Sequence, residues 1–132
     1  MPEDTLQIPL DHDLERLLTL AAATGQPGIS TMTPARARQW ADDSFTPAGE
    51  RRKIASVQSL TVAGGDGPIP ARIYDPAPES TLPLLVYFHG GGWVLGSLDQ
   101  SDDACRRLAI KTHARVISVD YRLAPEAPYP QS

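Results

Sequence analysis

The sequence predicts an α/β fold in which a helical N-terminal segment precedes a β-hairpin and then a parallel β-α-β unit. Three observations support this order. Apolar residues recur at helical spacing over residues 10–24, the spacing becomes that of strands after residue 53, and two apolar runs after residue 83 flank a helix-like segment. Apolar strands joined through a helix are typical of parallel pairing, in which both faces of the sheet are covered.

The first predicted helix covers residues 10–24. Its apolar side chains recur at positions that share one helix face, as in an amphipathic helix. The residues of this face are Leu10, Leu14, Leu17, Leu18 and Ala21. A carboxylate favours a helix start and a glycine often ends a helix, so Asp11 and Gly25 mark its expected limits.

A second helix is predicted from the pair Thr33-Pro34, because threonine is a favourable N-cap and proline fits the first helical position. This helix would end near Phe45. Its inner face is expected to hold Trp40 and Ala41. Since the pattern changes within residues 45–53, we expect a boundary there that separates residues 1–50 from residues 51–132.

The segment that follows predicts a β-hairpin. Residues 54–64 have the spacing of a strand, and Val57, Leu60 and Val62 are expected on one face of it. The sequence GGDG then predicts a turn, and "IPARIYDP" a second strand. Because proline lacks an N–H, Pro70 indicates an edge strand or an irregular strand start.

The rest of the chain predicts the β-α-β unit. The run "LLVYFH", residues 84–89, is apolar throughout and is expected to be covered on both faces. Residues 99–113 predict a helix, and "ARVISVDYR" a second buried strand. The apolar side of that helix is expected to hold Ala104, Leu108 and Ala109. The two strands should therefore be parallel.

Composition excludes several classes of function. The net charge is −4 and no basic stripe is present, so neither a nucleic-acid partner nor an anionic membrane surface is indicated. No apolar run is long enough to span a bilayer, and the acidic N-terminus has no apolar core of a signal peptide. Cys105 is the single cysteine, which suits a reducing compartment. We expect a cytoplasmic protein.

Three consecutive glycines, Gly90 to Gly92, directly follow the predicted strand 84–89. Ligand sites of α/β folds lie at the C-terminal ends of parallel strands. Glycines at such a position allow main-chain N–H groups to approach a ligand, which suits an anion or a developing oxyanion. A simple turn is the alternative. A phosphate loop is disfavoured, because neither G-x-x-x-x-G-K-[ST] nor G-x-G-x-x-G is present.

The stretch "VYFHGGGW", followed by "VISVDYRLAPEAPYP", resembles the hormone-sensitive-lipase family of α/β-hydrolases, the HGGG-type esterases. The resemblance runs from about Ser56 to the end and extends to the preceding helices only in general layout. It implies an incomplete α/β-hydrolase sheet preceded by a helical cap segment. The activity that it implies is hydrolysis of a small-molecule carboxylic ester without a cofactor.

The resemblance also implies roles for residues of the glycine loop. The backbone N–H groups of Gly91 and Gly92 would form part of the oxyanion hole. His89 would brace the loop through hydrogen bonds, with Gly90 as part of the support. Trp93 would either line the substrate pocket or pack against the loop.

Two further expectations concern the surroundings of the loop. Arg122 and Glu126 of "DYRLAPE" are expected to form a structural ion pair. Gln100-Ser101 stands where the family usually carries a Ser/Thr-His pair, which affects how the loop is braced and leaves its N–H donors unchanged.

The residues of a catalytic triad are missing from the sequence. No serine lies in a G-x-S-x-G elbow, and all three histidines precede the point at which the family's base would occur. No His, Cys or carboxylate cluster has the spacing of metal ligands. We therefore expect a chain that is truncated before the nucleophile elbow and that is inactive alone.

Several readings of the function stay open at this point. The chain belongs either to a carboxylesterase, to a non-catalytic small-molecule-binding relative, or to an inactive truncated product. An oxyanion hole would serve an amide, carbamate or lactone as well as an ester. Without the strand that the family places beside it, "LLVYFH" would be an exposed apolar edge, so the isolated chain is expected to be poorly soluble or only partly folded.

Overall fold

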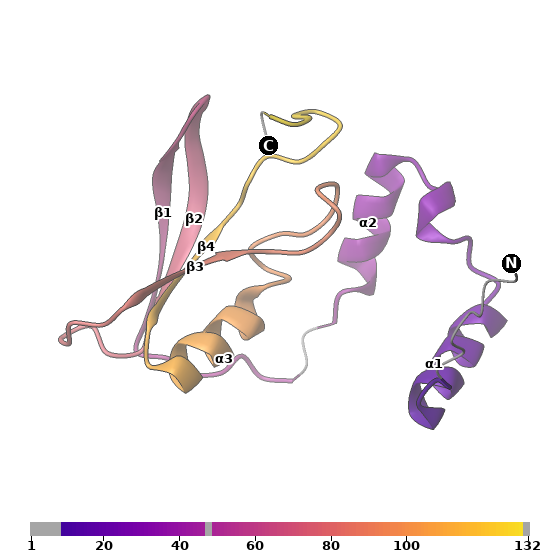
Figure 1. Cartoon of the computed structure of the whole chain (residues 1–132), viewed down its shortest axis with the longest axis horizontal. Coiled ribbons are helices and arrows are strands. Elements are labelled where there is room, and N and C mark those ends of the chain that lie inside the picture. The colour runs from indigo at the N-terminus through magenta and orange to yellow at the C-terminus, as the bar shows by residue number, and fades with distance from the viewer. Residues whose placement is uncertain (1–8, 47–48, 131–132) are drawn as a thin grey trace, which may run out of the picture. The chain divides into compact units, whose positions relative to one another are not determined.

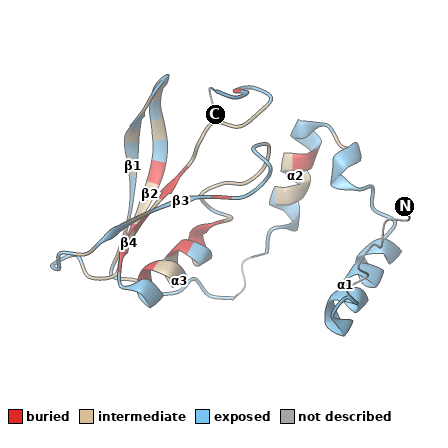
Figure 2. Ribbon diagram, viewed as in Figure 1, coloured by how far each residue is buried: buried red, intermediate tan, exposed pale blue. Residues whose placement is uncertain are grey.

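The structure, a computed structural model, describes residues 9–46 and 49–130 and divides the chain into two units, Met1–Met32 and Thr33–Ser132 (Figure 1). The first unit contains helix α1 (His12–Ala23). The Asp11 carboxylate caps this helix by accepting a hydrogen bond from the Asp13 amide at 2.9 Å. The predicted helix is confirmed, and all of its side chains are exposed (Figure 2).

The second unit begins with helix α2 (Pro34–Ser44), and Thr33 caps it by accepting a hydrogen bond from the Arg36 amide at 3.3 Å. The helix is as predicted. Its fully buried residue is Ala37, whereas Trp40 and Ala41 are half-buried. The two units divide ahead of α2, earlier than the predicted boundary in residues 45–53, of which 47 and 48 lie outside the described residues. The domain division at residue 50 stays a prediction.

A four-stranded mixed sheet forms the centre of the second unit, in the order β1-β2-β4-β3. The strands are β1 (Ser56–Gly64), β2 (Gly67–Asp75), β3 (Leu84–Phe88) and β4 (Arg115–Val119). The predicted hairpin is confirmed as the antiparallel pair β1-β2, with Gly67 at φ +121° closing its turn. The predicted parallel pairing is confirmed for β3 and β4, while β2 and β4 are antiparallel.

Helix α3 (Asp102–Thr112) joins β3 to β4 and covers one face of the sheet. Val57, Tyr74, Val116 and Leu85 are paired across the four strands, so their side chains share this face. The hydrophobic core lies between this face and α3, where buried residues are concentrated (Figure 2). The fully buried members of the core are Tyr74, Cys105, Ala109 and Val116.

The expectation that Val57, Leu60 and Val62 share one face is wrong. Side chains alternate along a strand, and an odd separation places Val57 opposite the other two. Val57 packs against the core under α3. On α3 itself the expected apolar side is shifted, because Ala104 is exposed whereas Cys105 and Ala109 are fully buried.

Strand β3 lies at the edge of the sheet and is covered on one face only, so the expectation of cover on both faces is wrong for the described residues. Leu84, Val86 and Phe88 are 60%, 49% and 64% exposed. The reason is that α3 packs on the opposite face, where Leu85 and Tyr87 contact the core.

Pro70 lies inside β2, an inner strand that begins at Gly67, so neither the edge nor the irregular-start alternative holds. Strand β2 pairs with β1 along its whole length, but its ladder with β4 begins only at Ala71. The Pro70 carbonyl accepts a hydrogen bond from the Asp120 amide at 2.9 Å, on the β4 side. Since the N–H and C=O of a strand residue point to the same side, the missing N–H of Pro70 falls just beyond the ladder.

Among the described residues, no helix has the length and apolar character needed to cross a bilayer.

Candidate functional site

The glycine loop starts at the C-terminal end of β3, where the chain leaves the sheet after Phe88. Gly91 and Gly92 have φ angles of +133° and +60°, which are left-handed conformations that favour glycine. The Gly91 carbonyl accepts hydrogen bonds from the amides of Val94 at 3.1 Å and Leu95 at 2.9 Å. The loop therefore folds back on itself over residues 91–95.

This reversal sets the direction of the Gly92 N–H group. The Gly91 carbonyl and the Gly92 amide belong to one planar trans peptide group, in which C=O and N–H point in opposite directions. Since the carbonyl points toward the amides of Val94 and Leu95, the Gly92 N–H points away from them. Within the part of the chain that the structure describes, neither the Gly91 nor the Gly92 amide donates to another residue.

Glycine is required at residue 91 for steric as well as conformational reasons. A Cβ atom built on it would overlap the carbonyl oxygen of Leu95. Gly90 and Gly92 differ from it, since a Cβ on either would meet no atom within 4 Å. Gly90 also lacks the positive φ of Gly91 and Gly92.

His89 attaches the loop to the segment after β4. Its side chain is buried, and Nδ1 donates to the Gly90 carbonyl at 2.9 Å, because a carbonyl oxygen can only accept. The imidazole stacks on the Tyr121 ring with centroids 4.4 Å apart, and the Tyr121 hydroxyl donates to the His89 carbonyl at 2.8 Å. Nε2 of His89 is buried and has no hydrogen-bond partner among the described residues.

Gly96 belongs to the same arrangement and was not among the predicted site residues. Its φ is +101°, and a Cβ atom on it would overlap Nδ1 of His89 and lie 2.5 Å from the Gly90 carbonyl oxygen. An isolated glycine in "WVLGS" is a signal for such a backbone position. The packing of Gly96 against His89 depends on the loop's tertiary shape, which the sequence pattern does not contain.

Trp93 projects from the loop with 69% of its surface exposed, and its backbone also has a positive φ of 61°. Two open hollows share it. One, of about 330 Å³, is lined by His89, the three glycines, Trp93 and Tyr121 together with Phe88. The other, of about 460 Å³, is lined by Gly92, Trp93, Ala124, Pro128 and Tyr129. The loop thus separates two spaces large enough for small organic groups.

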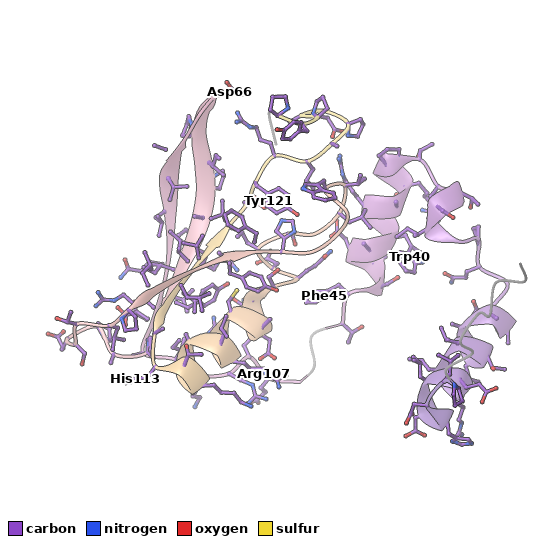
Figure 3. The ribbon with its side chains drawn as sticks, viewed as in Figure 1. Trp40, Phe45, Asp66, Arg107, His113 and Tyr121 are labelled. Carbon is purple, nitrogen blue, oxygen red and sulfur yellow. The ribbon has the colours of Figure 1, made fainter. Side chains whose placement is uncertain are left out.

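The ion pair expected between Arg122 and Glu126 is replaced by two other pairs. Glu126 accepts two hydrogen bonds from Arg38 of α2, at 2.9 and 2.6 Å, which lower the pKa of this carboxyl to about 2. Arg122 donates to the Asp66 carbonyl at 3.1 Å and lies 3.6 Å from the Asp66 carboxylate, at the tip of the β1-β2 hairpin (Figure 3). The planar guanidinium of Arg38 matches a carboxylate with two parallel bonds.

Gln100, which stands in place of the usual serine or threonine, links the segment before α3 to α2. Its Nε2 donates to the Asp42 carboxylate at 2.8 Å, and its amide donates to the Ser97 hydroxyl at 3.3 Å. Ser101 is buried and its carbonyl accepts from the Cys105 amide at 3.0 Å, so it starts α3.

The described residues bring together no nucleophile with a base. His12 is exposed on α1, and His113 forms the left-handed C-cap of α3. None of the described histidines bonds a serine or cysteine side chain. Cys105 lies in the core, where burial raises the pKa of its thiol. No group of three or more His, Cys, Asp or Glu side chains within the described ranges could hold a metal ion.

Comparison with known proteins gives a consistent set of relatives. Residues 85–132 match the family described as the alpha/beta hydrolase fold. The chain is 38% identical over 124 residues to the carboxylic ester hydrolase LipN of Mycobacterium tuberculosis, covering 92% of this chain and 32% of that protein. It is 54% identical over 77 residues to the carboxylesterase NlhH of the same species, covering 56% of this chain and 24% of that protein.

Solved structures agree with these relatives. A hyperthermophilic esterase from the archaeon Pyrobaculum calidifontis superposes with a TM-score of 0.81 at 41% identity, covering 94% of this chain and 40% of that one. An ester hydrolase from the metagenome of Lake Arreo, complexed with a bipyridine phosphonate derivative, gives a TM-score of 0.78 at 38% identity. It covers 94% of this chain and 40% of that one. The chain spans about a third of the length of LipN.

Proposed function

The chain belongs to the α/β-hydrolases of the hormone-sensitive-lipase type, and from this premise we propose that it supplies the oxyanion-hole loop of a carboxylic-ester hydrolase. The observation that carries the proposal is that the Gly91 and Gly92 N–H groups, at the C-terminal end of a parallel strand, donate no hydrogen bond to any of the described residues. Relatives over nearly the whole chain are named as ester hydrolases.

The proposed chemistry is acyl transfer to a serine. A serine hydroxyl from outside the 132 residues attacks the ester carbonyl, and a histidine held by an acidic residue takes its proton. The carbonyl oxygen then carries a negative charge, to which the Gly91 and Gly92 N–H groups donate. Each such donor contributes roughly 3 kcal/mol to stabilising the transition state.

The surroundings of the loop fit this assignment. His89 would act as a brace, because its Nδ1 proton is committed to the Gly90 carbonyl and its ring to Tyr121. Trp93 would border the acyl or alcohol side of the substrate, since its exposed indole lines both hollows. Residues 1–50 would form the cap segment, and the protein would work in the cytoplasm on small-molecule esters.

The first experiment is to extend the coding sequence beyond Ser132 and express the longest protein that it encodes. We expect a G-x-S-x-G serine, a later acidic residue and a later histidine, and hydrolysis of p-nitrophenyl esters that is lost in the serine-to-alanine variant. The 132-residue chain serves as the matched control and should show no turnover.

Two outcomes would contradict the proposal. A full protein that binds ester analogues without hydrolysing them would be a non-catalytic member of the fold. A reading frame that stops at Ser132 would make the chain an inactive product.

A further inference from the structure

Arg38, on α2, has every nitrogen of its guanidinium bonded. Nε donates to the Val94 carbonyl at 2.8 Å, and one terminal nitrogen donates to the Ala124 carbonyl at 2.8 Å. Both terminal nitrogens donate to the Glu126 carboxylate, at 2.9 and 2.6 Å. The side chain is 28% exposed, so this is a largely covered anchor.

The acceptors of Arg38 lie on the two segments that flank the hollow beside Trp93. Val94 belongs to the glycine loop, while Ala124 and Glu126 belong to the turn after β4. The two segments are also bonded directly, since the Ala124 amide donates to the Trp93 carbonyl at 2.8 Å. One guanidinium thus holds three chain segments, including α2, in a fixed relation.

A short chain of bonds runs from Arg38 to the proposed oxyanion donors. Arg38 holds the carbonyl of Val94, and the amide of Val94 donates to the Gly91 carbonyl at 3.1 Å. The direction of that carbonyl sets the opposite direction of the Gly92 N–H group, because both belong to one peptide plane. Displacement of Val94 would therefore turn the Gly92 donor.

We propose that Arg38 is a positioning residue that keeps the Gly92 N–H aimed at the oxyanion through the Val94 carbonyl. The inference rests on the proposed function. Lysine cannot replace this arrangement, because a single ammonium group lacks the planar fork that reaches two carbonyls and a carboxylate together. Arginine at residue 38 thus couples the helix of the cap segment to catalysis without touching the substrate.

The test uses R38Q and R38K in the longest protein that the reading frame encodes, with R36Q as the matched control. Arg36 lies on the same helix, is exposed and donates no side-chain hydrogen bond among those of the described residues. We expect both Arg38 variants to lower kcat for a p-nitrophenyl ester by about tenfold to a hundredfold, the range for a misplaced catalytic group. KM should change by less than about threefold, because an oxyanion-hole donor acts mainly in the transition state. R36Q should match the unaltered protein.

A tetrahedral inhibitor separates positioning from simple loss of stability. The inhibition constant of an arylboronic acid, whose boronate oxygen would occupy the oxyanion hole, should rise by the same factor by which kcat falls. Loss of folded protein alone would lower the active fraction and leave that constant unchanged.

Hydrogen exchange on the same variants gives a readout that does not depend on turnover. R38Q should speed exchange of the Val94, Leu95 and Ala124 amides by at least about tenfold, as expected for local opening of bonded loops, while R36Q should not. Equal kcat, inhibition and exchange in R38Q and R36Q would overturn the inference. Absence of hydrolysis in the unaltered protein would instead overturn the proposed function, and faster exchange in R38Q would still support the anchor.

Discussion

At the scale of single residues, the glycine loop combines positive φ angles with close backbone packing. Gly91 and Gly96 each lie where a Cβ atom would overlap a neighbour, whereas Gly90 and Gly92 have open space. Gly91 and Gly96 therefore shape the loop, whereas Gly90 and Gly92 leave open space beside the loop amides. His89 connects the two roles, because its ring is covered by Gly96 and stacked on Tyr121.

We expect the substitution G96A to destabilise the protein that contains this loop. Alanine would have to adopt a φ near +101° and would overlap His89 Nδ1. Strain of this kind costs roughly 1–3 kcal/mol. Urea denaturation should therefore show that the free energy of unfolding falls by at least this amount in G96A. The control is G65A in the hairpin turn, where φ is not positive and a Cβ would meet no atom within 4 Å. Equal effects of the two substitutions would show that Gly96 carries no special constraint.

The site could be predicted from the sequence only where its residues are contiguous. His89 to Trp93 follow one another after an apolar strand, so motif and strand position together identified the loop. Arg38 gave no such signal, because its three partners are 56, 86 and 88 residues further along the chain and two of the three are backbone carbonyls. For the same reason the pairing of Glu126 with Arg122 was wrong, since both arginines were candidates by charge alone.

At the scale of elements, the first turn of α3 is held by a buried carboxylate. Asp102 accepts from Arg106 at 2.7 Å, from Tyr74 at 3.1 Å and from Arg72 at 3.3 Å, and only 4% of its side chain is exposed. These bonds join α3 to β2. Burial opposes ionisation of Asp102, but the hydrogen bonds from Arg106 and Tyr74 and the charges of Arg106 and Arg51 together outweigh it and hold its pKa below the usual value.

We expect D102N to lower the free energy of unfolding by about 3–5 kcal/mol, the usual cost of removing one partner of a buried ion pair. The matched control is D103N, because Asp103 is the next residue, is far more exposed and lies 3.5 Å from Arg52. A surface pair of this kind contributes less than about 1 kcal/mol. If urea denaturation shows similar losses of unfolding free energy in D102N and D103N, the buried carboxylate of Asp102 does not hold the first turn of α3.

The same carboxylate predicts a pH dependence. Since the pKa of Asp102 is lower in the folded than in the unfolded state, its stabilisation is complete above the unfolded value near 4 and is lost as pH falls through the folded value. The fall in stability on acidification should therefore be smaller in D102N than in the unaltered protein. If D102N and the unaltered protein lose the same stability on acidification, other carboxylates cause that loss.

The elements differ in how well local sequence specifies them. Helices α1 and α2 were predicted within two residues, because Asp11 and Thr33 are local caps. The buried face of α3 was predicted less well, since Ala104 and Cys105 are both small and only contact with the sheet decides which is covered. Strand faces follow from strict alternation, and an odd separation such as that of Val57 and Leu60 should have excluded a shared face.

At the scale of the whole chain, α3 covers one face of the sheet in the second unit, and β3 exposes apolar side chains on the opposite face. Strand β3 is an edge, and three of its five side chains are exposed apolar groups. Such an edge offers both unpaired backbone groups and apolar surface to another chain. The chain covers 32% of LipN and 40% of the Pyrobaculum esterase, consistent with the proposal that further chain covers this strand.

We expect the isolated 132-residue chain to self-associate, and V86K to reduce that association. Val86 is at the centre of the uncovered face of β3, so a lysine there would add a charge that opposes pairing of edge strands. T61K is the control, because it adds the same charge at an exposed position of β1, the opposite edge. Sedimentation velocity should show V86K shifted toward monomer relative to both the unaltered chain and T61K. A chain that is already monomeric and unfolds cooperatively would show that β3 needs no cover, and an equal effect of T61K would assign the association to net charge rather than to this strand.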